Sequence, residues 1–227
     1  MTCKAILFDL DGTLVDSTEQ VEDIWRRWAE RDGIEPSRIL SMSHGRRTED
    51  TLQEVVPYLD IEAEARFLNA EELRFHEGIK AIHGSGALLE TLPRDRWAVV
   101  TSATRAAAKL RLGCAGLPIP TTLVAAEDVV EGKPDPAGYL RACELLGFSP
   151  DQCLVAEDAP AGVLAARAAG MRVLGVTTTF PASELLADEC LRDFCDVRVV
   201  SVMGDDQLHL QLGLGESDLT TRTALRG

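Results

Sequence analysis

The chain has 227 residues, of which 45% are hydrophobic and 26% are charged, so its length suits one sizeable domain or a domain with a smaller insert. Its formal net charge of −14 at pH 7 disfavours nucleic-acid binding, because an acidic surface repels the phosphate backbone. No apolar run reaches the roughly 18 residues of a membrane-spanning helix, and the first apolar run is too short for a signal peptide. We therefore expect a cytoplasmic protein without a membrane partner, either a monomer or a weak dimer.

Short apolar runs recur along the chain without the strict alternation of a half-buried strand. This pattern is typical of strands buried on both faces of a parallel sheet. The predicted strands are 5–8, 97–100, 122–125, 153–156, 172–176 and 197–202. Helical patterns between them, at 138–146 and 161–169, each end at a glycine. The alternation predicts an α/β fold with a doubly wound, mostly parallel, Rossmann-like sheet.

Residues 18–83 break this rhythm, because they contain no convincing strand. Apolar residues near the start of this segment recur at helical spacing, at Val21, Ile24, Trp25 and Trp28. We therefore predict an inserted α-helical cap at 16–83. The catalytic core would consist of 1–15 and 84–227.

The end of the chain gives a weaker pattern. The alternating segment LHLQL at 208–212 predicts a short edge strand. The polar residues 215–227 are expected to be disordered.

Polar residues follow three of the predicted strands, at the edge where parallel α/β sheets bind ligands. They are Asp9 and Asp11 after the first strand, Thr101 and Ser102 after the second, Glu157 and Asp158 after the fourth, and also Lys133 in the loop after the third. Each alone is compatible with a turn, a helix cap, a loop or a solvated surface, but their joint placement favours one site. Carboxylates suit Mg²⁺, and a carboxylate can attack phosphorus. A lysine and a hydroxyl can neutralise phosphoryl oxygens.

With these residues in place, the sequence resembles the haloacid dehalogenase-like superfamily of phosphatases. The motifs that carry the resemblance are DLDGTLVDS at 9–17, VVTSAT at 99–104, GKPDP at 132–136 and VAEDAPAGVLAARAAGM at 155–171. They span nearly the whole chain apart from its final residues. Alanine stands at position 103, where several relatives have glycine, but it keeps the backbone N–H.

The resemblance implies a role for each core residue. Asp9 would be the nucleophile and Asp11 the general acid and base. Mg²⁺ would be held by Asp9, by Asp158 and by the backbone carbonyl of Asp11, and Glu157 would support this metal shell.

The remaining core residues would handle the phosphoryl group. Thr101 would donate a hydrogen bond to it, assisted by the backbone at Ser102. Lys133 would bridge the nucleophile and the phosphate.

The segment SHGRRTEDTL at 43–52 supplies cations within an acidic protein. A solvated loop before a helix would also explain it. Together with the core motifs, it resembles the branch that contains glycerol-phosphate and 2-deoxyglucose-6-phosphate phosphatases. That resemblance implies substrate contacts from His44, Arg46 and Arg47.

These observations predict a Mg²⁺-dependent phosphomonoesterase that hydrolyses small sugar or polyol phosphates through an aspartyl-phosphate. Its partner would be a small phosphorylated metabolite. One alternative is a phosphosugar mutase of the β-phosphoglucomutase type, which would return the phosphoryl group to a sugar. Another is a non-catalytic protein that binds a phosphorylated metabolite without turnover.

Overall fold

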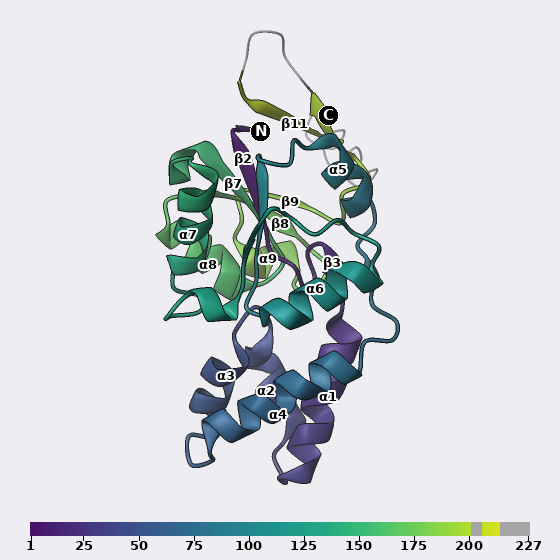
Figure 1. Ribbon diagram of the computed structural model, residues 1–227, viewed down its shortest axis with the longest axis vertical. Helices are drawn as coiled ribbons and strands as arrows, with labels where there is room; N and C mark the ends of the chain where they lie inside the picture. The colour runs from purple at the N-terminus through teal and green to yellow at the C-terminus, as the bar shows by residue number, and fades with distance from the viewer. Residues whose placement is uncertain (201–205, 214–227) are drawn as a thin grey trace, which may run out of the picture.

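The computed structural model describes residues 1–200 and 206–213. Figure 1 shows an α/β core built on a twisted sheet, with a bundle of helices beyond one end of the strands. No helix within these described ranges is long and apolar enough to cross a membrane.

The central sheet has six parallel strands in the order β6-β5-β2-β7-β8-β9. The strands are β2 (Ala5–Phe8), β5 (Trp97–Val100), β6 (Thr122–Val124), β7 (Cys153–Glu157), β8 (Arg172–Val176) and β9 (Glu189–Leu191). The first five confirm predicted strands and the predicted α/β fold. Strand β9 was missed because its three residues are too few to form a recognisable apolar run.

Both faces of the sheet are buried, because alternate residues of each strand pack into two apolar clusters, one on each face. Within β2, Ile6 and Phe8 belong to one cluster, whereas Ala5 and Leu7 belong to the other. Helices α5 (Ser85–Thr91) and α6 (Arg105–Cys114) cover the first face. The second face is covered by α7 (Ala137–Leu146), α8 (Pro160–Ala168) and α9 (Ala182–Leu185). Burial on two sides explains why the strands read as continuous apolar runs.

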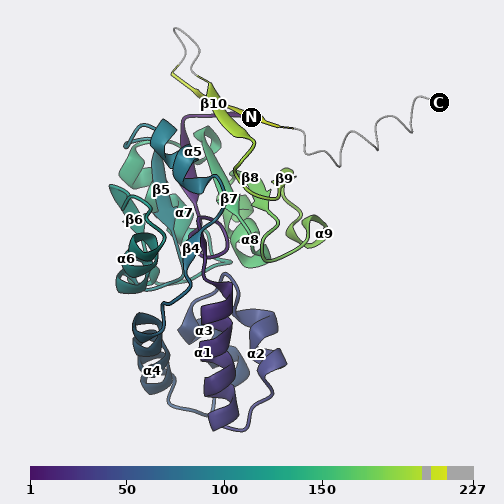
Figure 2. The same ribbon diagram turned by 90° about the vertical axis from the view of Figure 1, so that its right-hand side faces the viewer.

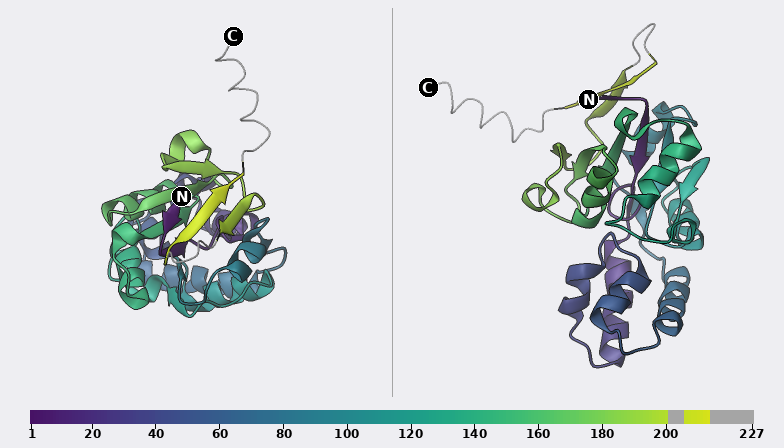
Figure 3. Two further views of the ribbon diagram at one scale, coloured as in Figure 1. Left: turned by 90° about the horizontal axis from the view of Figure 1, so that it is seen from above. Right: turned by 90° about the vertical axis from the view of Figure 1, so that its left-hand side faces the viewer.

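A second, antiparallel sheet lies at the end of the core far from the helical bundle (Figure 3). Its order is β1 (Thr2–Cys3), β11 (Leu208–Leu212) and β10 (Val197–Val200). The prediction that 197–202 joins the parallel sheet is therefore wrong. The prediction of an edge strand at 208–212 is also wrong in part, because β11 is a strand but pairs on both sides. Residues 201, 202 and the predicted disorder at 215–227 lie outside the described residues.

The inserted segment forms four helices with an apolar cluster of their own (Figure 2). They are α1 (Thr18–Arg31), α2 (Pro36–Ser43), α3 (Thr48–Val55) and α4 (Ile61–Arg74). Two short antiparallel strands, β3 (Val15–Asp16) and β4 (Lys80–Ala81), join this bundle to the core. The expectation that 18–83 holds no strand is wrong at β4, which is too short to leave a pattern.

Candidate active site

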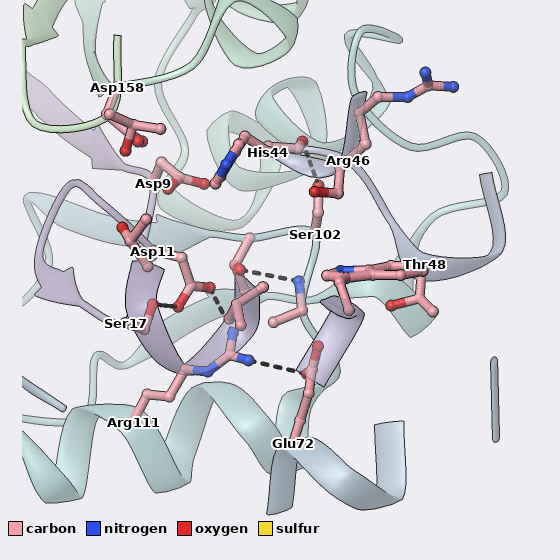
Figure 4. A pocket seen from close by; sticks show the side chains of 18 residues that line it. Asp9, Asp11, Ser17, His44, Arg46, Thr48, Glu72, Ser102, Arg111 and Asp158 are labelled. Carbon is pink, nitrogen blue, oxygen red and sulfur yellow. Dashed lines mark hydrogen bonds and ion pairs between the residues drawn. The ribbon is translucent and has the colours of Figure 1, made fainter. Parts of the chain in front are cut away.

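The parallel sheet brings the predicted core-site residues together. Strand β2 lies between β5 and β7, with Phe8 paired to Val99 on one side and to Ala156 on the other. The segments after these strands line one pocket of about 640 Å³, part of which is open to solvent. Predicted residues on its wall are Asp9, Asp11, Thr101, Ser102 and Asp158. Figure 4 labels all of these except Thr101.

Lys133 reaches the same place from the loop after β6 and is buried beneath the pocket. Its Nζ donates to Asp9 Oδ1 at 2.5 Å, to Glu157 Oε1 at 2.8 Å and to the carbonyl of Val100 at 3.1 Å. Burial lowers the pKa of Lys133, but Asp9 and Glu157 more than offset this and raise that pKa well above its usual value. These contacts favour the charged form of Lys133 beside Asp9.

Glu157 is fully buried and both of its oxygens already have donors. Oε1 accepts from Lys133 and from the Tyr139 hydroxyl at 3.1 Å, while Oε2 accepts from the backbone N–H groups of Asp158 and Ala159. A Cβ at Gly162 would lie 1.5 Å from Glu157 Oε1, so only glycine leaves room for the carboxylate. Glu157 thus holds Lys133 and the loop after β7 in place.

Asp9 and Asp158 offer carboxylate oxygens that could hold a metal ion, although Asp158 Oδ1 also accepts from the Thr13 hydroxyl at 3.0 Å. With Glu157 they form a group whose ligand atoms all lie within 4.8 Å of one another. The chain passes close to them at Gly12, which has φ +81° and where a Cβ would lie 2.1 Å from Asp158 Oδ2. An all-oxygen, carboxylate donor set of this kind fits Mg²⁺.

The acidity of these carboxylates also fits a cation. Burial, followed by the charge of Glu157, raises the pKa of Asp158 to about 7. Burial is also the main cause that raises the pKa of Asp9 well above its usual value, although Lys133 opposes it. A divalent ion held between the two would favour their ionised forms.

This gives a test by pH. Without a divalent cation, the free energy of unfolding should fall as pH rises from about 4 to about 7, because the folded protein binds more protons than the unfolded chain in that range. Mg²⁺ should therefore raise the melting temperature more at pH 8 than at pH 5. Thermal unfolding in EDTA and in Mg²⁺ at both pH values measures this. An equal Mg²⁺ effect at both pH values, or one that survives Asp158→Asn, would contradict it.

Asp11 is held from two sides. Its Oδ1 accepts from the Ser17 hydroxyl at 2.6 Å, and its Oδ2 accepts from Arg111 Nη1 at 2.7 Å (Figure 4). Arg111 Nη2 also lies 3.0 Å from Glu72 Oε2 on α4. Burial lowers the pKa of Arg111, but Asp11 and Glu72 outweigh it and raise that pKa. Arg111 therefore carries a charge between two carboxylates.

Neither Arg111 nor Glu72 was predicted as a site residue. A signal for Arg111 exists in the sequence, because it stands four residues after Ala107 on the apolar face of its helix, where a charged residue requires a partner. Glu72 offers a comparable signal, because it stands four residues after Leu68 on the buried face of α4.

Thr101 and Ser102 differ in what their hydroxyls do. Thr101 lines the pocket, and its Oγ1 accepts from the backbone N–H of Ala103 at 3.0 Å. Ser102 Oγ donates to the carbonyl of Gly45 in the α2–α3 loop at 2.9 Å, which joins the core to the helical bundle.

The three predicted substrate residues of the α2–α3 loop do not share one location. His44 lies in the pocket near Asp9, with Nε2 3.2 Å from Glu22 Oε1. Arg46 also lines the pocket, but Figure 4 shows its guanidinium pointing away from Asp9, where Nη1 pairs with Glu54 at 2.6 Å.

Arg47 is not brought to this pocket. Its Nε and Nη2 each donate to Asp50 at 2.8 Å, and its Nη1 donates to the carbonyl of Val130 at 2.9 Å. These contacts tie the loop to the core beside the Lys133 loop. The i,i+3 spacing of Arg47 and Asp50 is a signal that the sequence offered for this pairing.

The sequence model of the haloacid dehalogenase-like hydrolase family matches residues 3–170 of this chain. The chain therefore belongs to the haloacid dehalogenase-like hydrolases. The predicted family is confirmed.

The chain is also similar to individual proteins of known sequence or structure. Hexitol phosphatase A of Escherichia coli (strain K12) is 45% identical over 181 residues, which cover 78% of this chain and 84% of that protein. Glycerol-1-phosphate phosphohydrolase 2 of Saccharomyces cerevisiae is 34% identical over 200 residues, covering 82% and 80%. The crystal structure of a hydrolase from Pseudomonas syringae superposes with a TM-score of 0.77 at 30% identity, over 85% of this chain and 94% of that one.

Proposed function

We propose that this protein is a Mg²⁺-dependent phosphomonoesterase that hydrolyses small sugar or polyol phosphates through an aspartyl-phosphate on Asp9. The observation that carries this is the buried Asp9 carboxylate, bonded to Lys133 and placed beside Asp158 and Asp11 in one pocket. The similarity to a hexitol phosphatase and a glycerol-1-phosphate phosphohydrolase supports the choice of substrate class.

In the first step, an oxygen of Asp9 attacks phosphorus while Asp11 donates a proton to the departing ester oxygen. Lys133 and the Thr101 hydroxyl neutralise and orient the phosphoryl oxygens. In the second step, Asp11 takes a proton from the water that attacks the aspartyl-phosphate, which releases phosphate and restores Asp9.

Mg²⁺ would be held by the side chains of Asp9 and Asp158 and by the backbone carbonyl of Asp11. Bound there, it supplies positive charge that keeps the carboxylates ionised beside an anionic phosphate. Glu157 does not need to bind it, because its oxygens already accept four hydrogen bonds.

We assign residues 16–83 to a cap and residues 1–15 and 84–227 to the catalytic core. The cap covers the pocket, with Ser102–Gly45 and Arg47–Val130 contacts between the two parts. A closed cap excludes water and contacts the alcohol part of the substrate. In this cap we assign substrate contact to His44 and Arg46 and a docking role to Arg47.

The test is phosphate release from a panel of polyol, hexose, pentose and nucleotide monophosphates. We expect turnover with Mg²⁺, little turnover in EDTA, and the best kcat/KM among polyol and hexose phosphates. An isomerised sugar phosphate without phosphate release would favour a mutase instead. Thermal stabilisation by these compounds without any product would favour a binding protein.

A further inference from the structure

Arg111 forms a buried link between the core and the cap. It lies on α6 in the core, and its side chain is 5% exposed. Its Nη1 donates a hydrogen bond to Asp11, and its Nη2 pairs with Glu72 on cap helix α4 (Figure 4). The Glu72 side chain is 11% exposed. Among residues 1–200 and 206–213, Arg111 is the side chain that contacts both Asp11 and helix α4.

The geometry of arginine makes this link directional. A guanidinium is planar and its N–H groups point in fixed directions, so two acceptors on different arms hold each other in a fixed relation. Asp11 Oδ2 faces Arg111, and Oδ1 faces Ser17, which stands just before the first cap helix. Both oxygens of Asp11 are therefore held by residues that depend on the position of the cap.

Removing Glu72 would leave Arg111 with one carboxylate in a buried place. A buried cation that loses a partner reorients toward water or toward another acid, since an uncompensated charge there is costly. Asp9 is the further acid near Arg111. Glu72 thus keeps Arg111 on Asp11 in the orientation that the structure shows.

We propose that Arg111 is a positioning residue that aims Asp11 at the departing ester oxygen, and that Glu72 restricts this aim to the docked cap. The inference rests on the proposed function, because it concerns the proton that Asp11 donates. As the bond from Asp9 to phosphorus forms and the bond from phosphorus to the ester oxygen breaks, the proton passes from Asp11 to that oxygen. A mispositioned Asp11 leaves an alkoxide to depart unprotonated.

Two substrates separate this role from a structural one. An alkyl ester such as a hexitol 6-phosphate needs the proton, whereas p-nitrophenyl phosphate releases a stable anion without it. The ratio kcat/KM reports steps up to release of the alcohol and excludes hydrolysis of the aspartyl-phosphate. We expect Arg111→Gln to lower kcat/KM by about 100-fold for the hexitol phosphate and by less than about 10-fold for p-nitrophenyl phosphate.

Further variants test the contacts that join Asp11, Arg111 and Glu72. Glu72→Gln should give the same split between substrates in a milder form, and it keeps the proposal testable where Arg111→Gln fails to fold. Arg111→Lys should recover less than half of the kcat/KM for the hexitol phosphate that Arg111→Gln loses. The reason is that an ammonium group cannot hold Asp11 and Glu72 in the fixed geometry of a guanidinium. In an Asp11→Asn background, Arg111→Gln should lower kcat/KM for the hexitol phosphate by less than about 3-fold more.

Arg105→Gln is the matched control, since Arg105 lies on the same helix but bonds to Leu123 and Asp128 outside the pocket. It should leave both kcat/KM values within about 3-fold of the wild type. Equal losses for the two substrates, or full additivity with Asp11→Asn, overturn the inference while leaving the phosphatase proposal intact. A wild type that releases phosphate from no compound of the panel overturns both proposals.

Discussion

Asp9→Asn is expected to lower phosphate release from the best substrate by about 10⁴-fold or more, because the amide is a poor nucleophile toward phosphorus. The change is nearly isosteric, so Lys133 and Glu157 keep their places. It also removes one of the carboxylates that we assign to Mg²⁺. The measurement is steady-state phosphate release with Mg²⁺ for the wild type and the variant at equal, verified concentrations.

A trapped intermediate adds a second readout to this prediction. Rapid acid quench of the wild type during turnover should give a chain heavier by one phosphoryl group, and Asp9→Asn should not. Asp23→Asn is a suitable control, because Asp23 is exposed on α1 and pairs with Arg26 away from the pocket. A variant at Asp9 that retains a tenth of the wild-type rate would exclude Asp9 as the nucleophile.

The core of the site could be predicted because a parallel sheet is a strongly constrained arrangement. Once the apolar runs at β2, β5 and β7 are recognised, their carboxyl ends must meet, and the polar residues after them meet with them. Asp9, Thr101 and Asp158 follow directly from that rule. Lys133 was placed at the same edge through the loop after the third strand, which fixes its position less closely, and its role as a bridge between nucleophile and phosphate came from the family resemblance.

Pairings between distant segments could not be predicted in this way. The 197–200 run looks like the other strands, but its partner β11 returns along it in the opposite direction and also pairs with the first residues of the chain. Local pattern carries no information on strand direction. The Arg111–Glu72 pair is similar, because it joins helices of two separate apolar clusters, and neither cluster reveals where the other lies.

Charge alone does not tell which cations of the cap loop are available to a substrate. The segment HGRR was read as a source of cations for an anionic substrate, but Arg46 and Arg47 each pair with a nearby acid, Glu54 and Asp50. In a chain with 37 acidic and 23 basic residues, most cations find an acidic neighbour. The cations near Asp9 are instead the buried Lys133 and Arg111, whose partners belong to the site itself.

Lys133→Met should destabilise the protein by about 3–5 kcal/mol at pH 8, because it leaves Asp9 and Glu157 as buried carboxylates without their shared cation. Methionine has a similar length, so packing loss contributes little. Turnover should fall by about 100-fold or more, since both the nucleophile and the phosphoryl oxygens lose a positive partner. Chemical denaturation and phosphate release measure the two effects.

The sign of the pH dependence distinguishes charge from packing in this variant. Lys133 opposes the upward shift of the Asp9 pKa, so its loss raises that pKa further and lets folded Asp9 hold a proton to higher pH. The folded variant then binds more protons than the unfolded chain. The loss in its free energy of unfolding, relative to the wild type, should therefore grow as pH rises from about 5 to about 8. Lys109→Met, at an exposed position on α6, should show no such growth. A deficit that stays constant with pH would attribute the loss to packing and remove Lys133 from the electrostatics of Asp9.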